Sequence, residues 1–433
     1  MNHHRQPTRR VFLQQSALVA AGVCLGNRIT RATGPSPNST LGIAVVGVAG
    51  RGADNLHGVA HETIVALCDV DESRAGGARE QFPKAKFFAD YRQMLDTLDK
   101  DIDAVVISTA DHTHAAIAMA ALKAGKHVYC EKPLTHSVYE ARQLTETAAR
   151  LKRVTQMGNQ IHAGGNYRRV VELVQRGAIG SIREAHVWCG SVWAGGERPT
   201  DTPPVPEGLH WDLWLGPAPY RAYHPDYVPA KWRGWWDFGG GGLGDMGCHY
   251  MDLAHWALDL RHARAAEAQG PPVHAEHAPD KLTVTWDYPA RGEQPAVKLT
   301  WYGGQTRPGD VAQGQIPEWG AGVLFVGARG MLLANYDEHR LLPEKDFADF
   351  QRPDPFIPDS IGHHKEWTEA CKTGGPTTCG FDYTGPLTET VLLGNVAYRA
   401  GRRIEWDAAN FKIPNAPEAM RYLRRPYRQG WSL

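Results

Sequence analysis

A lysine, an aspartate and a histidine are the residues of this sequence whose types and spacing best suit proton transfer. Lys132 stands two residues after a short apolar run, His127 to Cys130, and Asp245 and His249 stand four residues apart. Residues at that spacing share one face of a helix, so the carboxylate and the imidazole are expected to lie together. A lysine can hold a substrate oxygen and move a proton, and a histidine with an ordinary pKa of about 6.5 suits base work near neutral pH. The three residues are predicted to form a proton-transfer set.

The position of Lys132 also predicts where the reaction takes place. A helical run from Ala115 to Ala124, closed by a glycine, precedes the strand that leads to Lys132. In an open parallel sheet, ligands bind in the crevice beyond the carboxyl ends of the strands. Lys132 and its neighbour Glu131 are therefore predicted to contact a cofactor as well as the reacting group.

A glycine-rich turn near the start of the chain predicts a phosphate site. The apolar run Leu41 to Val46 is typical of a strand buried on both faces, and it leads into a glycine-rich turn that opens a helix. The turn is the dinucleotide fingerprint with one departure, because Ala49 takes the second glycine position. Its glycines let the backbone approach a pyrophosphate that sits on the helix N-terminus. The predicted cofactor contacts are Gly47, Ala49, Gly50, Arg51 and Gly52.

An acidic residue after the second predicted strand favours NAD over NADP. The apolar run Thr63 to Cys68 ends in Asp69, about 20 residues after the first glycine of the turn, where an acid accepts a hydrogen bond from the adenosine ribose. A carboxylate there also repels a 2′-phosphate. Arg51 or Arg74 could neutralise such a phosphate, so NADP remains possible.

A third strand completes the pattern of the N-terminal half. The run Asp103 to Ser108 is followed by Thr109-Ala110-Asp111-His112-Thr113-His114 and then by a helix. Strands and helices that alternate in this way define a doubly wound parallel sheet. Ser108, Thr109 and His114 are predicted to contact the cofactor at the mouth of the crevice, although a histidine at a helix start is as often a simple surface residue.

Taken together, these segments resemble the Gfo/Idh/MocA oxidoreductases, a family that includes glucose–fructose oxidoreductase and inositol dehydrogenase. The resemblance rests on the glycine turn, Cys68-Asp69-Val70-Asp71, the run from Thr109 to His114, and Glu131-Lys132-Pro133, and it extends over nearly the whole chain after the leader. The family carries Asp-x-x-x-His at the place of Asp245 and His249. The resemblance implies that Lys132 is catalytic and that His249 is the acid/base, and it completes a triad of Lys132, Asp245 and His249.

The second half predicts an α+β domain with an open, largely antiparallel sheet. Alternating apolar segments between Leu282 and Ala334 are separated by glycine turns, and such a sheet also suits subunit contact in a homodimer or homotetramer. The segment from Trp188 to Trp236 holds seven of the 14 tryptophans. Aromatic faces stack on the C–H faces of sugar rings, but large side chains also pin down long loops. The predicted substrate contacts are Gln160, His162, Trp235 and Trp236.

The N-terminus is predicted to be an export signal. Two arginines, Arg9 and Arg10, precede a charge-free stretch from Val11 to Asn27, the pattern of a twin-arginine signal. The stretch is too short and too polar for a membrane span, so no stable membrane anchor is expected. We predict a signal peptide over residues 1–32, a linker over 33–40, an NAD(P)-binding Rossmann domain over 41–155 and a C-terminal domain over 156–433. The twin-arginine export machinery would then deliver a folded protein to the periplasm.

Composition excludes some classes of partner and restricts others. The formal net charge is +0, so no footprint for nucleic acid or anionic membrane is present. The seven cysteines are expected to be small core residues, although Cys371 and Cys379 could pair outside the cytoplasm. Asp245, His249 and Asp252 could in principle hold a divalent metal, but nothing requires one, and Asp252 is expected to cap or pair locally.

Two functions of the same residues stay open. In the first, NAD takes hydride from a secondary alcohol carbon of a sugar, polyol or cyclitol, His249 removes the hydroxyl proton and Lys132 steadies the oxygen. In the second, transient oxidation, elimination and re-reduction cleave a glycosidic bond with no net redox change. A non-catalytic sensor is disfavoured for three reasons. The sequence contains all three proton-transfer residues, it carries a predicted export signal, and it has no basic patch for binding DNA. Export also predicts that NAD is tightly bound.

Overall fold

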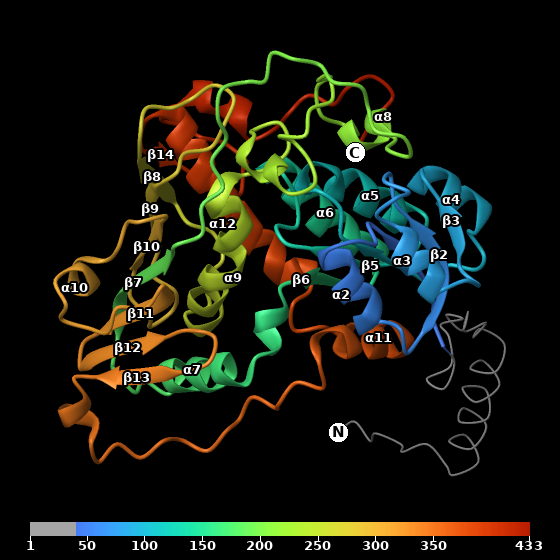
Figure 1. Ribbon diagram of the computed structural model, residues 1–433. Helices are drawn as coiled ribbons and strands as arrows, with labels where there is room; N and C mark the ends of the chain where they lie inside the picture. The colour runs from blue at the N-terminus through green and yellow to red at the C-terminus, as the bar shows by residue number, and fades with distance from the viewer. Residues whose placement is uncertain (1–39) are drawn as a thin grey trace, which may run out of the picture.

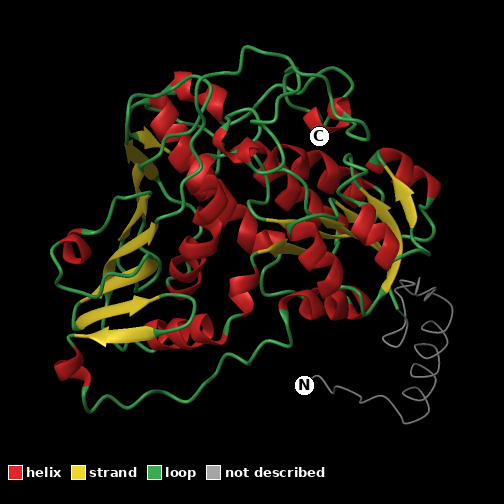
Figure 2. Cartoon of the chain, in the orientation of Figure 1, coloured by secondary structure: helices red, strands yellow, loops and turns green. Residues whose placement is uncertain are grey.

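Two β-sheets organise residues 40–433, which are the part of the chain that the computed structural model describes (Figures 1 and 2). One sheet is parallel and forms the N-terminal half, and the other is mixed and forms most of the C-terminal half. The predicted signal peptide, and all of the predicted linker except Thr40, lie outside the described residues.

The parallel sheet has six strands in the order β3-β2-β1-β4-β5-β6. Its central strand β1 is buried along its whole length, which explains why the apolar run in the sequence is continuous. The strand order reverses between β1 and β4, and this switch point creates the crevice at the carboxyl ends of the strands. The strands are β1 (Gly42–Val46), β2 (Thr63–Cys68), β3 (Lys86–Phe88), β4 (Ala104–Ile107), β5 (His127–Glu131) and β6 (Thr155–Gly158), and the helices between them are α2 (Arg51–Gly58), α3 (Gly76–Gln81), α4 (Tyr91–Thr97), α5 (Asp111–Lys123) and α6 (Val138–Leu151).

The second sheet has eight strands in the order β13-β12-β11-β7-β10-β9-β8-β14. All neighbours pair antiparallel except β7 and β10, which run parallel. Along β9 the residues alternate between buried and half-buried, because one face of the sheet packs on helices. The strands are β7 (Ile182–Cys189), β8 (Ala265–Gln269), β9 (Leu282–Tyr288), β10 (Val297–Gly303), β11 (Ala321–Gly327), β12 (Gly330–Ala334), β13 (His339–Leu342) and β14 (Ile404–Glu405).

Two long helices join the sheets. Helix α9 (Gly241–Ala257) packs on β7, β10 and β11, and helix α12 (Phe381–Ala400) packs on α9, on β8 and on α6 of the first half (Figure 1). Both helices are mostly buried, so the two halves share one continuous core. The remaining helices are η1 (Gln160–Ala163), α7 (Gly165–Gln175), α8 (Trp211–Leu215), η2 (Lys231–Gly234), α10 (Gly309–Ala312), η3 (Glu344–Phe347), α11 (His363–Thr373) and η4 (Pro417–Tyr422).

The predicted fold class is confirmed, whereas the predicted boundary between the halves needs a small correction. Strand β6 ends at Gly158 and belongs to the parallel sheet, so the N-terminal half extends beyond residue 155. Helix α11 also returns to this half, where Trp367 and Cys371 pack beside Tyr129. A sequence boundary cannot include α11, because the helix is more than 200 residues away along the chain.

The cysteines of the described residues are free and buried, so Cys371 and Cys379 do not pair. Their side chains are 3% and 0% exposed and serve the core, as the alternative prediction stated. Within residues 40–433, no three or more His, Cys, Asp or Glu side chains are grouped so that they could hold a metal ion. In the same residues, no helix has the length and apolar character needed to cross a membrane.

Candidate active site

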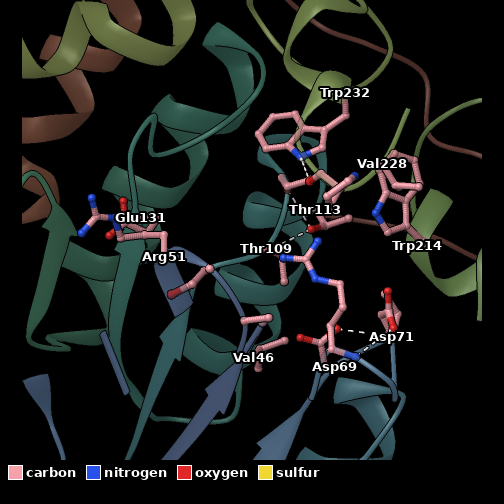
Figure 3. Close-up of a pocket in the computed structure, with 18 of the residues that line it drawn as sticks. Val46, Arg51, Asp69, Asp71, Thr109, Thr113, Glu131, Trp214, Val228 and Trp232 are labelled. Carbon is pink, nitrogen blue, oxygen red and sulfur yellow. Dashed lines mark hydrogen bonds between the residues drawn. The ribbon is translucent and has the colours of Figure 1, made fainter. Parts of the chain in front are cut away.

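A cavity of about 1100 Å³ lies at the carboxyl edge of the parallel sheet (Figure 3). Its floor comes from the ends of β1, β2, β4 and β5, and its opposite wall comes from the segment that contains α8 and η2. In Figure 3, Trp214 and Trp232 of that segment lie on one side of Thr109 and Thr113, and Asp69 lies on the other. The predicted cofactor and substrate contacts that line the cavity are Gly47, Ala49, Gly50, Arg51, Asp69, Ser108, Thr109, Glu131, Lys132, Gln160 and His249.

The turn between β1 and α2 has the shape that a pyrophosphate needs. Gly47 has a φ of +80°, and its amide donates to the carbonyl of Cys68 at 2.8 Å. A Cβ atom on Gly52 would lie 1.9 Å from the carbonyl oxygen of Gly47, so only glycine permits this close approach. Gly52 therefore shapes the turn and does not line the cavity. The turn brings its backbone and the N-terminus of α2 to the cavity, which fits the phosphate groups of a dinucleotide.

Asp69 stands at the end of β2 and ties the turn to the sheet. Its carboxylate accepts hydrogen bonds from the amides of Val48, at 2.9 Å, and Asp71, at 3.0 Å. Burial raises the pKa of Asp69, against the lowering effect of these amides. Arg74 lines the same end of the cavity, whereas Arg51 forms an ion pair with Asp54 at 3.1 Å. The adenosine end thus contains the predicted acid with a cation nearby.

Lys132 and Asp245 form an ion pair at the other end of the cavity. The Lys132 Nζ donates to Asp245 Oδ1 at 2.6 Å and to the Asp245 carbonyl at 2.8 Å. Trp193 Nε1 donates to Oδ2 at 2.6 Å, and Arg233 Nε donates to Oδ1 at 3.2 Å. Burial opposes the ionisation of Asp245, but Lys132 and Arg233 outweigh it and lower the pKa of the carboxyl to about 2. Asp245 is therefore ionised at neutral pH and holds Lys132 in place.

His249 lines the cavity on the same helix, but its ring makes no hydrogen bond to the Asp245 carboxylate. Burial, with a contribution from the charge of Lys132, lowers the pKa of His249 to about 3, so the ring is neutral at pH 7. Its Nδ1 is buried and has no hydrogen-bond partner among residues 40–433. Nε2 is therefore the ring nitrogen that can meet a substrate. The spacing correctly predicted that both residues share α9, but it could not show that Trp193 and Arg233 take the remaining bonds of the carboxylate.

A buried network around Glu131 connects the strand ends. Glu131 Oε1 accepts hydrogen bonds from Asn55 Nδ2 at 2.9 Å and from Gln160 Nε2 at 2.6 Å. Asn55 also donates to Ser108 Oγ at 2.9 Å, and its Oδ1 bonds to His364 Nε2 at 2.9 Å. Burial raises the pKa of Glu131, and Asn55 is the strongest opposing influence. Asn55 and His364 belong to no recognisable sequence motif, so neither residue was predicted for this network.

Two histidines predicted to contact cofactor or substrate lie elsewhere. His114 is 1% exposed, and its ring bonds to the carbonyls of Pro133, at 2.9 Å, and Thr109, at 3.0 Å. It therefore supports the loop that carries Lys132. His162 is equally buried, bonds to Asp252 at 2.9 Å and stacks on a tryptophan, with ring centroids 4.0 Å apart. Neither lines the cavity, and both predictions are corrected.

Asp252 also differs from its predicted local role. Its carboxylate is fully buried and bonds to His162, 90 residues earlier, and to Tyr383, 131 residues later. The Tyr383 hydroxyl donates to Oδ1 at 2.7 Å. Asp252 thus helps to join η1 and α12 to α9, which is a structural role.

The predicted contacts of Trp235 and Trp236 with substrate are corrected as well. Their side chains are 3% and 6% exposed and lie outside the cavity wall. Their indole nitrogens donate to the carbonyls of Asp226 and His274, each at 3.1 Å. They pin down their segment, the alternative stated for these aromatics. Trp214, Tyr223 and Trp232 are the aromatic residues of this segment that line the cavity.

The adenosine end of the cavity is covered from outside the Rossmann domain. The His210 amide donates to the carbonyl of Val70 at 2.8 Å, and the Glu72 amide donates to the carbonyl of Gly208 at 2.9 Å. Trp431, near the C-terminus, lines the cavity and lies beneath the guanidinium of Arg92, 4.6 Å from its ring centroid. We call residues 206–210 and Trp431 the strap. The strap lines the end of the cavity at which Asp69 and Asp71 lie.

Comparison with known proteins identifies the family. Residues 41–159 match the model of the oxidoreductase family with an NAD-binding Rossmann fold, and residues 178–289 match the C-terminal alpha/beta domain of the same family. Together the two matches cover more than half of the chain. The chain belongs to the Gfo/Idh/MocA oxidoreductase family. The resemblance predicted from the sequence is confirmed, and the match to the NAD-binding domain confirms NAD as the predicted cofactor.

Similar curated proteins are inositol 2-dehydrogenases. The protein of Salmonella typhimurium is 31% identical over 153 residues, which is 34% of this chain and 45% of the relative. The protein of Rubrobacter xylanophilus is 37% identical over 147 residues, 33% of this chain and 41% of the relative. The chain thus aligns with less than half the length of these relatives.

Solved structures of similar fold cover the chain more fully. GenD2 from gentamicin A biosynthesis, in complex with NAD, has a TM-score of 0.59 and 22% identity, and the match covers 87% of this chain and 99% of GenD2. The WlbA dehydrogenase of Bordetella pertussis, in complex with NADH and UDP-GlcNAcA, has a TM-score of 0.60 and 16% identity, with 85% and 99% covered. At these identities the likeness shows the fold.

Proposed function

We propose that this Gfo/Idh/MocA protein is an NAD-dependent oxidoreductase that transfers a hydride to or from a secondary alcohol carbon of a sugar, polyol or cyclitol. The ion pair of Lys132 with Asp245 at one end of the cofactor cavity, with His249 beside it, carries this proposal. The names of the inositol 2-dehydrogenases that align with the N-terminal half support the polyol or cyclitol class.

The residues of the cavity fit NAD along its length. The turn from Gly47 to Gly52 would hold the pyrophosphate on the N-terminus of α2. The Asp69 carboxylate, which keeps lone pairs after its two amide bonds, would accept a hydrogen bond from the adenosine ribose. When bound, NAD supplies the hydride acceptor for oxidation of the alcohol.

Lys132 holds the reacting oxygen in this proposal. An ammonium group has three donors, and Lys132 uses two of them on Asp245. The third remains for the substrate hydroxyl, where a fixed positive charge stabilises the developing negative charge on oxygen. Because Lys132 is paired with the ionised Asp245, the lysine acts mainly as a hydrogen-bond donor. His249 Nε2 is neutral and accepts the hydroxyl proton.

The proposal is tested with the purified protein, NAD and a panel of neutral sugars, polyols and inositols, by absorbance at 340 nm. Reduction of NAD by at least one panel member, and its loss in Lys132→Met, is the expected result. If no member of the panel reduces NAD and no reduced cofactor is consumed with the matching ketones, the oxidoreductase proposal fails.

A second candidate function is glycosidic cleavage through transient oxidation, elimination and re-reduction. The strap favours it, because a cofactor enclosed at its adenosine end can be reduced and reoxidised without leaving. Incubation with aryl glycosides separates the two functions. Release of the phenol without net NADH supports the glycosidase, and NADH without phenol supports the dehydrogenase.

The strap also supports the proposal that NAD is tightly bound, which suits a protein exported in folded form by the twin-arginine pathway. Tight binding requires that the contacts exist before the cofactor arrives, and the strap is ordered by backbone hydrogen bonds. The measurement is the nucleotide released on denaturing protein from the periplasmic fraction. One nucleotide per chain is expected, and activity that depends wholly on added NAD would contradict the proposal.

A further inference from the structure

One carboxylate of the cavity has no part in the proton-transfer set. Asp111 is the first residue of α5 and follows β4, at the same edge of the sheet as Lys132. Its side chain lines the cavity and the residue is only 5% exposed. Across residues 40–433, no other residue donates a hydrogen bond to this carboxylate. This buried carboxylate therefore lines the cavity without a hydrogen-bond partner from the described part of the protein.

The charges around Asp111 come from three other elements. Arg233 of η2, Lys132 at the end of β5 and Asp245 of α9 are the groups that act on it. Burial raises the pKa of Asp111 to about 7, and Arg233 and Lys132 offset part of this effect. A helix N-terminus normally favours an ionised carboxylate, by about 0.3–1 kcal/mol at an exposed site. Here the loss of water outweighs that stabilisation.

Such a group is costly unless something in the cavity pairs with it. A buried carboxylate without hydrogen bonds loses its hydration and gains no partner in return. The Asp245 carboxylate shows the opposite arrangement, with three donors (Lys132, Trp193 and Arg233) and a pKa lowered to about 2. The Asp245 carboxylate, which does not line the cavity, is thus satisfied by the protein, whereas the Asp111 carboxylate is left open to a ligand.

We propose that Asp111 is a substrate-contacting residue that accepts hydrogen bonds from hydroxyl groups next to the reacting carbon. This inference rests on the proposed function and extends it to substrate recognition. A carboxylate has two oxygens and about four lone-pair sites, so it can accept from two neighbouring hydroxyls at once. Substrates with vicinal hydroxyls relieve the desolvation of Asp111, whereas a substrate with a single hydroxyl leaves it unpaired.

Arg233 is held in a fixed position near Asp111. Its Nε bonds to Asp245, and its guanidinium lies 4.2 Å from the ring centroid of Trp232. Lys132 Nζ bonds to the same Asp245 oxygen, at 2.6 Å, so the two cations lie side by side. Both act on Asp111, so a substrate oxygen held by Lys132 brings its neighbouring hydroxyls to the Asp111 carboxylate.

The test is Asp111→Asn, which keeps the shape and removes the charge. The matched control is Asp382→Asn, an exposed acid in the first turn of α12 outside the cavity. The substrate is the most active member of the polyol and inositol panel, compared with its analogue that lacks the hydroxyl next to the reacting carbon. Loss of a charged hydrogen bond to substrate predicts a fall of about 10–100-fold in kcat/KM on the polyol, mainly through KM, and less than about 3-fold on the deoxy analogue. The control is expected to change neither value.

Two further readouts separate this role from a structural one. The NADH dissociation constant of Asp111→Asn, from fluorescence titration, is expected to stay within about 3-fold of wild type, because Asp111 is proposed to contact the substrate and not the cofactor. The kcat/KM of wild type is expected to rise as pH increases through about 7, where Asp111 ionises, and the variant is expected to lose this limb.

The outcomes distinguish the two proposals. Equal losses on the polyol and its deoxy analogue would overturn the role of Asp111 and leave the oxidoreductase function intact. A weakened NADH affinity would assign Asp111 to the cofactor and overturn the role as well. A wild-type protein that is inactive on the whole panel would instead reject the proposed function, and the recognition role with it.

Discussion

The ion pair between Lys132 and Asp245 allows a prediction that separates catalysis from stability. Replacing Lys132 by methionine keeps a side chain of similar length and removes the charge. Replacing Asp245 by asparagine keeps the shape of the acid and leaves Lys132 and Arg233 as two cations without their counterion. Both variants are expected to lose turnover. In Lys132→Met the substrate oxygen loses its hydrogen-bond donor, and in Asp245→Asn the Lys132 ammonium loses the carboxylate that holds it in place. Their stabilities are expected to differ.

The magnitudes follow from the pKa of Asp245. Its change from the ordinary 3.8 to about 2 corresponds to roughly 2–3 kcal/mol, since one unit is about 1.4 kcal/mol. Because the folded-state pKa is lowered, this stabilisation is present above pH 4 and is lost as pH falls through about 2. Lys132 is the largest lowering influence, so Lys132→Met is expected to cost about 1–2 kcal/mol. Asp245→Asn is expected to cost about 3–5 kcal/mol, the usual range for a buried pair that loses one partner.

The assays are urea unfolding at pH 7 without cofactor and steady-state kinetics on the best panel substrate. Lys132→Met is expected to bind NAD with wild-type affinity and to lose about 10²–10⁴-fold in kcat/KM. The control is Lys231→Met, whose ammonium pairs with Asp226 on the exposed surface. Turnover of Lys132→Met within a few-fold of wild type would remove Lys132 from the mechanism. A Lys132→Met protein less stable than Asp245→Asn would refute the electrostatic reasoning.

Three further predictions concern the cofactor. Asp69→Ala is expected to narrow the preference for NAD over NADP, because the ribose loses its acceptor and the repulsion of a 2′-phosphate disappears; an unchanged ratio of the two dissociation constants would show that Asp69 serves only the turn. Gly52→Ala is expected to weaken NAD binding by about tenfold or more, or 1.4 kcal/mol, because the new Cβ forces the carbonyl of Gly47 to move; NAD titration checks this, and wild-type affinity would mean that the turn relaxes freely. Trp431→Ala opens the strap and is expected to speed NAD release several-fold in stopped-flow fluorescence with little change in association, as contact losses generally act on dissociation.

The cofactor half could be predicted from the sequence because its signals are local. A continuous apolar run, a glycine turn and an acid at the end of the next strand each lie within a few residues of one another. The glycine turn and Asp69 consequently meet, and the Val48 amide of the turn donates a hydrogen bond to the Asp69 carboxylate. Lys132 could be placed for the same reason, since it ends a strand of the same sheet.

The substrate side could be predicted only in part, because its partners are distant in sequence. Trp193 and Arg233 reach Asp245 from a long irregular segment, and their bonds depend on how that segment packs. The same packing decides that Trp235 is buried in its own cluster while Trp232 also lines the cavity. Aromatic composition alone gives both residues the same prediction. The predicted substrate contact of His162 was wrong for the same reason, because its partner Asp252 lies 90 residues away along the chain.

The charged side chains near Lys132 bear on whether the proposed substrate is neutral or acidic. Lys132 and Arg233 are balanced by Asp245 and Asp111 when both acids are ionised. Asp245 remains ionised through the physiological range, whereas Asp111 titrates near neutral pH, so ionisation of Asp111 adds one negative charge beside Lys132 and Arg233. A sugar acid would have to face the ionised Asp111 above pH 7, in a region where water screens charges poorly. A neutral molecule with adjacent hydroxyls meets no such repulsion and supplies the donors that Asp111 lacks. This repulsion supports the proposal that the substrate is a neutral polyol or cyclitol and not a sugar acid, and it does so without reference to the relatives.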